Sequence, residues 1–299
     1  MIVSNSDELT RQVLAVMQQT EDSRLREIMT SLIRHLHGFV RDVRLTEEEF
    51  RAATDLIARM GQLTNDRHNE VVLMAGSLGV SALVCLLNNG DDGATETSAT
   101  SASLLGPFWR MNSPPAANGA SLLRSPTPGP AFVFTGHVRD RRGQPVAGAE
   151  VDAWHCSTAG LYENQDPSQA DMNLRGKFIT DENGTFSFRS IKPVGYPIPI
   201  EGNVVGELLL AQHRHNYRPA HVHVLIFKPG FKTLISQVFM PDDPHVEDDV
   251  QFGVTRALIG DLVRHDEQGE QGDGAPWYTM DYTFVIDEGE AKLPRAPIK

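Results

Sequence analysis

Apolar residues recur at intervals of three and four along the first third of the chain, and this spacing predicts amphipathic helices. A capping box of Thr46 and Glu49 begins the third helix. A fourth helix is predicted from about Glu70 to Leu87. The first three apolar stripes are Leu9, Val13, Val16 and Met17; Leu25, Ile28, Met29, Leu32, Ile33, Leu36, Phe39 and Val40; and Phe50, Ala53, Leu56, Ile57 and Met60.

The first two helices lie at the end of the chain, where a small helical layer has little of its own to pack on. Their apolar stripes therefore indicate one of two arrangements. Part of the layer packs on a second subunit, or the helices cap the remainder of their own chain.

Proline and short polar residues separate this helical part from the rest. Residues 91–103 are rich in Ser and Thr and predict a loop, and Leu104 begins a short apolar segment that ends at Trp109. Five prolines then follow within residues 114–130, which excludes helix and central strand and predicts an extended linker.

From Ala131 the apolar period changes from helical spacing to two, which predicts short β-strands. Hairpins are predicted for residues 177–188, with the turn at 181–184, and for residues 221–240, with the turn at 228–230. Further strands begin near residues 131, 149 and 278. Such closely spaced strands predict an antiparallel β-sandwich or barrel. The expected domains are a helical N-terminal domain over 1–103, a Pro-rich linker over 104–130 and a β-sandwich catalytic domain over 131–299.

Composition excludes several classes of partner. The formal net charge of −12 over 299 residues disfavours nucleic acid and anionic membranes. The start of the chain lacks a signal pattern, and no apolar run is long enough to span a bilayer. Two cysteines, far apart and in no paired motif, fit a reducing cytoplasm. No phosphate-binding glycine loop and no Ser-His-Asp context is present.

Two histidines occupy alternate positions of one predicted strand. His221 and His223 are two residues apart, so their side chains project from the same face. Two imidazoles so placed can share a metal ion, because neutral imidazole is the commonest protein metal ligand. The alternative is an ordinary pair of polar residues on a strand.

Two of the five tyrosines do not look like core residues. Tyr162 follows a glycine just after a strand, and Tyr196 lies in a loop bracketed by prolines. A metal ion can deprotonate a phenol well below its free pKa of about 10. Two phenolates and two imidazoles suit Fe(III), whereas Zn(II) usually takes thiolate, imidazole or carboxylate.

The sequence Gly195-Tyr196-Pro197-Ile198-Pro199, followed by Arg218-Pro219-Ala220-His221-Val222-His223, resembles the intradiol ring-cleavage dioxygenases. The catechol and hydroxyquinol 1,2-dioxygenase group is the most similar, over nearly the whole chain. The resemblance implies a transthyretin-like sandwich and one non-haem Fe(III) per subunit. It also implies a homodimer through the N-terminal helices, where lipid is able to bind. The iron ligands that it implies are Tyr162, Tyr196, His221 and His223, with Arg218 and Gln237 beside them.

The implied reaction inserts both atoms of O2 between the two hydroxyl-bearing carbons of a catechol-type ring, without nicotinamide or flavin. Hydroxyquinol is favoured as the substrate, giving 3-hydroxy-cis,cis-muconate or maleylacetate, over catechol or chlorocatechol. Gly76 is a departure, since many relatives carry an aspartate there. The expected pocket residues are Leu73, Gly76, Leu105, Gly106, Pro107, Phe108, Ile198, Pro199 and Arg218.

A second class of function stays open. Residues 143–151, with the sequence GQPVAGAEV, are also typical of transthyretin-like sandwiches that only bind or space other domains. Fold alone does not decide between such a module and an enzyme.

Overall fold

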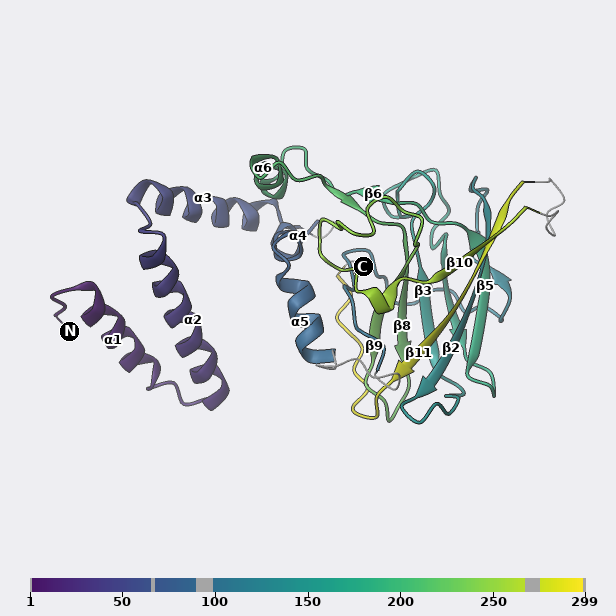
Figure 1. The fold of residues 1–299 in the computed structure, drawn as a ribbon, viewed down its shortest axis with the longest axis horizontal. Helices are drawn as coiled ribbons and strands as arrows, with labels where there is room; N and C mark the ends of the chain where they lie inside the picture. The colour runs from purple at the N-terminus through teal and green to yellow at the C-terminus, as the bar shows by residue number, and fades with distance from the viewer. Residues whose placement is uncertain (1, 66–67, 90–98, 267–274, 298–299) are drawn as a thin grey trace. The chain divides into compact units, whose positions relative to one another are not determined.

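The computed structural model describes residues 2–65, 68–89, 99–266 and 275–297 (Figure 1). Residues 91–98 of the predicted loop lie outside the described residues, and residues 99–103 have no regular secondary structure. The chain divides into two compact units, Met1–Arg59 and Met60–Lys299. The division at residues 103 and 130 expected from the sequence stays a prediction.

The first unit holds the predicted helices α1 (Ser6–Met17) and α2 (Ser23–Asp42) and most of α3 (Glu47–Leu63). A side chain caps each of them. Asn5 accepts from the Glu8 amide, Asp22 accepts from the Leu25 amide, and the capping box forms. None of the described residues of α1, α2 and α3 is buried, so their apolar stripes are open to solvent in the single chain.

The predicted fourth helix is wrong in one respect, because it is two helices. α4 (Glu70–Ser77) and α5 (Val80–Asn89) are separated at Leu78-Gly79 and bent by 76°. Gly79 has φ +72°, a left-handed conformation that breaks the helical hydrogen bonds and suits glycine. In the described part of the chain no single helix is long and apolar enough to cross a membrane. Only this bent pair passes by length and composition.

Two sheets form the β-sandwich expected from the sequence (Figure 1). The five-stranded sheet has the order β1-β5-β2-β11-β10, the four-stranded sheet has the order β4-β3-β8-β9, and β6 pairs with β7. The strands are β1 (Ala120–Ser121), β2 (Ala131–Asp140), β3 (Glu150–Trp154), β4 (Arg175–Ile179), β5 (Thr185–Ile191), β6 (Tyr196–Pro197), β7 (Tyr217–Arg218), β8 (His221–Phe227), β9 (Leu234–Phe239), β10 (Asp261–His265) and β11 (Trp277–Ile286).

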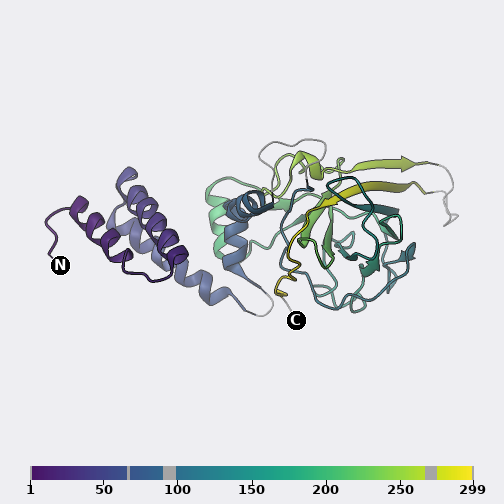
Figure 2. The same cartoon turned by 90° about the horizontal axis from the view of Figure 1, so that it is seen from below.

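The core lies between the two sheets. Every second residue of β2 is buried, and Phe134 packs on Phe186 and Phe188 of β5, with ring centroids 6.0 Å and 5.2 Å apart. The four-stranded sheet contributes Val222 and Val224 of β8 to the same core. The side chains on the opposite face of that sheet are therefore not part of this core. The β10–β11 ribbon extends beyond the sandwich (Figure 2).

The predicted hairpin over residues 177–188 is wrong. β4 pairs with β3 in one sheet and β5 pairs with β2 in the other, so the turn at 181–184 crosses between sheets. The turn itself forms as expected, because Asp181 accepts the amides of Asn183 and Thr185, and Gly184 has φ +70°. The hairpin of β8 and β9 is confirmed. Two pairs, β2 with β11 and β1 with β5, run parallel, and β10 was not predicted.

Helix α6 (Val204–Ala211) completes the second unit, where α4, α5 and α6 lie beside the sandwich (Figure 1). Asn203 caps it by accepting from the Gly206 amide. Glu70 of α4 accepts from the Val205 amide at 2.8 Å, which joins α4 to α6.

Candidate metal centre

Strand β8 carries the two predicted histidine ligands on its outer face. Val222 and Val224 point into the core, so His221 and His223 point to the opposite side of the sheet. Loops cover this side, and both imidazoles are buried. Their Nε2 atoms lie 3.1 Å apart.

The two predicted tyrosine ligands come from separate segments and meet beside the histidines. Tyr196 opens β6, which pairs with β7, and Tyr162 follows a turn at Gly160. A side chain at Gly160 would lie 2.9 Å from the Cβ of Tyr196, so glycine permits this approach. The phenol oxygens are 3.3 Å apart. Ring centroids lie 5.7 Å apart for Tyr196 and His221 and 6.2 Å apart for Tyr162 and His223.

The register of the four-stranded sheet holds His223 in place. Arg175, Trp154, His223 and Gln237 lie directly opposite one another on β4, β3, β8 and β9. The Trp154 ring stacks on His223 at 4.6 Å with an interplanar angle of 4°. The Gln237 amide nitrogen lies 3.3 Å from His223 Nδ1 and donates to the Leu104 carbonyl at 2.7 Å. The imidazole is therefore fixed on both sides.

Arg218 lies beside the tyrosines, and Asp249 neutralises its positive charge. It is opposite Tyr196 in the β6–β7 pair, donates to Gln237 Oε1 at 2.9 Å and forms a buried ion pair with Asp249 at 3.2 Å. Burial lowers the pKa of Arg218, but the nearby oxygens of Asp249, Tyr196 and Tyr162 together outweigh burial and the pKa is raised. The guanidinium thus remains charged within a site closed to water.

The four predicted ligands are neutral donors before a cation binds. Burial raises the pKa of Tyr162 and Tyr196. Burial, with the nearby Arg218 charge, lowers the pKa of His221 to about 3, and burial followed by the charge of His221 lowers that of His223 well below its ordinary value. The result is a dry cluster of two oxygens and two nitrogens with no negative charge of its own.

This donor set fits a metal ion. His221 donates its Nδ1 proton to the Pro219 carbonyl at 2.7 Å, which leaves its Nε2 lone pair facing the cluster. Nε2 of His223 faces the same point at 3.1 Å, so at most one proton lies between them, and a cation that replaces it meets both nitrogens. Two phenol oxygens complete a mixed oxygen and nitrogen set, which suits a hard trivalent ion.

Some of the predicted pocket residues contact this cluster. A Cβ on Gly106 would lie 3.1 Å from Cε1 of His223, and the Phe108 ring lies 4.6 Å from that of Tyr162. Leu105 packs on the same apolar group, which includes both tyrosines. Gly76 instead meets the side chain of Gln251. Among the described contacts, none joins the remaining predicted pocket residues to the four ligands; these are Leu73, Pro107, Ile198 and Pro199.

Sequence reasoning missed the residues that support the site. Glu163 follows Tyr162 and forms a buried ion pair with Arg175 at 2.8 Å, and the Arg175 guanidinium lies 5.9 Å from the centre of the Tyr162 ring. No sequence motif links Asp249 to its partner Arg218, because Arg218 lies 31 residues earlier. The sequence did offer one indication of such a supporting residue, because Glu163 places a carboxylate directly after the predicted ligand Tyr162.

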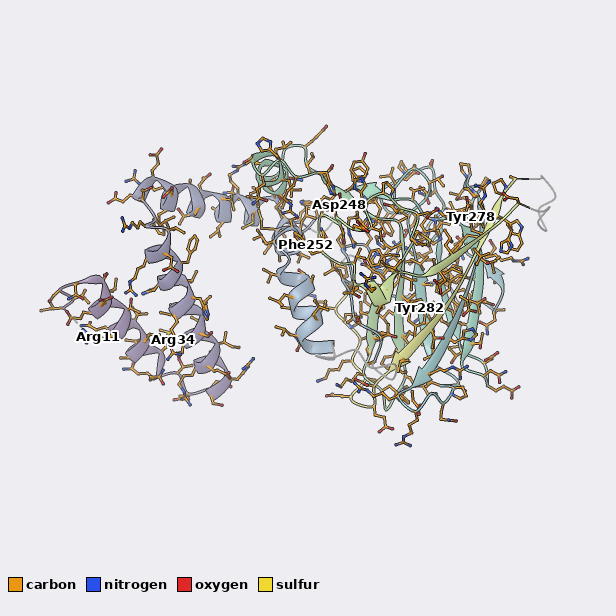
Figure 3. The ribbon with its side chains drawn as sticks, in the orientation of Figure 1. Arg11, Arg34, Asp248, Phe252, Tyr278 and Tyr282 are labelled. Atoms are coloured by element: carbon orange, nitrogen blue, oxygen red, sulfur yellow. The ribbon has the colours of Figure 1, made fainter. Side chains whose placement is uncertain are left out.

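A surface cluster of His215, His245 and Asp248 has ligand atoms within 4.8 Å of one another. The backbone amide of Tyr217 donates to Nδ1 of His215, so the ring proton lies on Nε2, 3.3 Å from Asp248. That proton occupies the nitrogen that a metal ion would need. The cluster is therefore a hydrogen-bonded one, and Asp248 lies at the surface (Figure 3).

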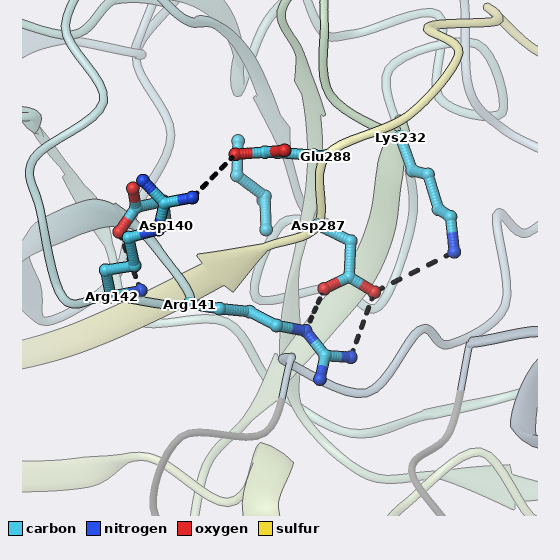
Figure 4. Close-up of a pocket in the computed structure, with 7 residues that line it drawn as sticks. Asp140, Arg141, Arg142, Lys232, Asp287 and Glu288 are labelled. Atoms are coloured by element: carbon cyan, nitrogen blue, oxygen red, sulfur yellow. Dashed lines mark hydrogen bonds and ion pairs between the residues drawn. The ribbon is translucent and has the colours of Figure 1, made fainter.

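A hollow of about 380 Å³ is lined by residues 140–142, 232 and 286–288 (Figure 4). Its charged residues pair with each other: Arg141 with Asp287, Arg142 with Glu288, and Lys232 with Asp287 at 3.9 Å. Its lining is thus internally neutralised and includes none of the predicted site residues.

Comparison with known proteins bears on the whole chain. A family model described as Dioxygenase matches residues 104–287, and one described as Catechol dioxygenase N terminus matches residues 22–96. Hydroxyquinol 1,2-dioxygenase of Rhizobium sp. (strain MTP-10005) is 39% identical over 279 residues, 92% of each chain. Catechol 1,2-dioxygenase of Candida albicans is 34% identical over 98% of this chain and 97% of its own. The crystal structure of hydroxyquinol 1,2-dioxygenase from Pseudomonas putida DLL-E4 superposes with a TM-score of 0.85 at 34% identity, covering 95% of this chain and 99% of that one.

Proposed function

The chain belongs to the intradiol ring-cleavage dioxygenases, which use non-haem iron, and on that premise we propose that it cleaves hydroxyquinol with O2. The substrate is inferred from similarity. Relatives named for hydroxyquinol reach 39% identity, and the catechol 1,2-dioxygenase of Candida albicans reaches 34%. Catechol or chlorocatechol is the second candidate, since those names also occur among similar structures.

The observation that supports the metal site best is the convergence of Tyr162, Tyr196, His221 and His223 in one buried cluster. In this proposal these four residues hold Fe(III). The bound ion supplies Lewis acidity and an electron sink for the ring. With such an ion bound, Tyr162 and Tyr196 would be phenolates, because a cation favours the phenolate over the neutral phenol.

Tyr196 is the proposed proton acceptor for the substrate. Arg218 lowers the pKa of Tyr196, in opposition to burial, which raises it. Arg218 also lowers the pKa of Tyr162, again in opposition to burial, and the Tyr162 ring packs against Phe108 at an interplanar angle of 33°. The resemblance to the family assigns the proton-accepting role to Tyr196, whose raised pKa would make its phenolate a base for a substrate hydroxyl.

Arg218 and Gln237 are proposed to act on the substrate side of the cluster. The Arg218 guanidinium keeps its charge in a buried site, where a fixed cation stabilises negative charge that develops on the ring. Gln237 joins this guanidinium to the His223 imidazole and so sets their relative position. Burial of the whole cluster excludes water from the reacting atoms.

The proposal extends to assembly and compartment. Leu25, Leu32 and Phe39 of α2 are each about half exposed and lie on one stripe, which fits a homodimer through the N-terminal helices, with lipid as a further occupant. The sequence has two cysteines, Cys85 and Cys156, far apart and in no paired motif, which fits a reducing cytoplasm.

Oxygen uptake by the iron-loaded protein tests the function. We expect faster uptake with hydroxyquinol than with catechol, and the reverse order would overturn the substrate assignment. Colour tests the metal site separately, because phenolate bound to Fe(III) absorbs visible light. A protein that stays colourless after iron loading would instead indicate the non-catalytic sandwich module.

A further inference from the structure

Gly76 of α4 leaves a space that another residue fills. A Cβ built on Gly76 would lie 3.0 Å from Cδ, 3.1 Å from Oε1 and 3.3 Å from Nε2 of Gln251. The amide group of Gln251 therefore occupies the volume that any side chain at position 76 would need. The two positions are linked, since a larger residue at 76 requires this amide to move.

Gln251 belongs to the loop that holds Arg218. Its backbone amide donates to Asp249 Oδ1 at 3.2 Å, and Gly253 donates to Asp249 Oδ2 at 2.8 Å. The same carboxylate accepts two hydrogen bonds from Arg218. A Cβ on Gly253 would lie 3.0 Å from Arg218 Nη2. Residues 249–253 thus wrap the guanidinium that faces the candidate site.

The loop and helix α4 are joined, so the position of Gln251 is fixed. Arg214 donates to the carbonyls of Ser77 at 2.7 Å and of Val250 at 2.8 Å, and its guanidinium lies 5.0 Å from the Phe252 ring. Phe252 lies beside the break between α4 and α5, 3.3 Å from where a Cβ on Gly79 would lie (Figure 3). The backbone on both sides of Gln251 is therefore held beside α4 before a substrate arrives.

The Gln251 amide is available to a ligand. The residue is buried, with 8% of its surface exposed, and within the described residues its side chain makes no hydrogen bond. A primary amide offers two donor hydrogens and an acceptor oxygen. Its polar capacity suits a neutral hydroxyl, which both donates and accepts, better than a chlorine atom or a bare ring carbon.

We propose that Gln251 is a specificity-determining residue that hydrogen-bonds the third hydroxyl of a trihydroxybenzene in the space beside Gly76. This inference rests on the proposed function and names the residue of that site that selects the triol. Loss of such a bond should appear chiefly in the preference between triol and diol, because both rings share the two hydroxyls that meet the metal.

The test compares Gln251→Met, which keeps the length of the side chain, with Gln144→Met, an exposed glutamine in the turn after β2. For each iron-loaded variant, kcat/KM is measured with hydroxyquinol and with catechol. We expect Gln251→Met to lower the ratio of the two values about 10-fold and Gln144→Met to leave it unchanged. An unchanged ratio in Gln251→Met would overturn the inference.

Anaerobic binding gives a second readout without turnover. The change in visible absorption on adding hydroxyquinol or catechol yields the Kd of each compound. The colour of the protein before the addition reports whether the metal site is intact. Gly76→Ala serves where Gln251→Met fails to fold, because the added methyl displaces the amide and should weaken the same preference. The proposed function is tested separately by the wild type, and it is wrong if the kcat/KM of the wild type is higher with catechol than with hydroxyquinol. The Gln251 inference is decided by the change in the ratio, whatever the wild-type preference.

Discussion

Replacing Asp249 with asparagine removes one charge from a buried ion pair and keeps the shape of the side chain. Asp249 and Arg218 are almost wholly buried, and two contacts of 3.2 Å join them. The variant leaves the guanidinium buried without a counter-charge. Breaking such a pair on one side costs about 3–5 kcal/mol. That is a large part of a typical unfolding free energy of about 5–15 kcal/mol.

Urea denaturation measures this loss, and the preceding residue supplies the control. Asp248 is 56% exposed, and among the described residues its carboxylate pairs with His215 and His245 alone, so Asp248→Asn should change the unfolding free energy by less than about 1 kcal/mol. Equal losses in Asp248→Asn and Asp249→Asn would refute the reasoning, since the argument depends on burial. Activity should fall in Asp249→Asn alone, because Arg218 loses its anchor.

The pH dependence of the difference has a definite sign. Burial raises the pKa of Asp249, but Arg218 and the hydrogen bonds to the carboxylate outweigh it, and the pKa is lowered. A lowered pKa stabilises the fold above the unfolded-state pKa of about 4, and this contribution is lost as pH falls toward the folded-state value. The gap between wild type and Asp249→Asn should therefore narrow below about pH 4.

Three further outcomes are expected. Tyr162→Phe should lose iron and visible colour whereas Tyr278→Phe keeps both, as metal analysis and absorption will show; iron retained in Tyr162→Phe would exclude that ligand. The free energy of unfolding of the metal-free protein, measured in urea, should decrease as pH falls from about 6.5 toward 3. The pKa of His221 is lowered to about 3 in the folded protein, so the unfolded chain binds the proton at a higher pH than the folded chain does. A constant free energy of unfolding over this window would contradict the prediction. Gly106→Ala should weaken iron binding and Gly143→Ala should not. Both glycines have positive φ, but only at Gly106 would the methyl meet His223, at 3.1 Å, so equal iron contents would refute the contact.

Alternation along the chain predicted the sandwich because the face that each strand buries is encoded in every second residue. Phe132 and Phe134 in β2 and Val222 and Val224 in β8 are all core residues. Strand partners are not encoded in that way. A turn at residues 181–184 fits a hairpin and a crossing between sheets equally well, and only packing of the phenylalanines of β4 and β5 against each other decides it.

The four predicted ligands were found from residue type and motif, but their support was not. Trp154 stacks on His223 and Gln237 lies opposite it only because three strands adopt one register. Asp249 reaches Arg218 across a loop. Such contacts arise from tertiary structure and leave no spacing in the sequence. The break at Gly79 was likewise invisible to hydrophobic periodicity, since the apolar stripe continues through it.

The placement of the histidines on the outside of the four-stranded sheet separates two requirements that many enzymes combine. Side chains on the inner face of β8 maintain the fold, and those on the outer face include the proposed ligands His221 and His223. Laboratory evolution of substrate range can therefore alter the segments that cover the outer face while the phenylalanine-rich interior stays constant. Libraries at positions 76 and 251 should contain a high proportion of well-folded members, and libraries at Phe134 or Val224 a low one.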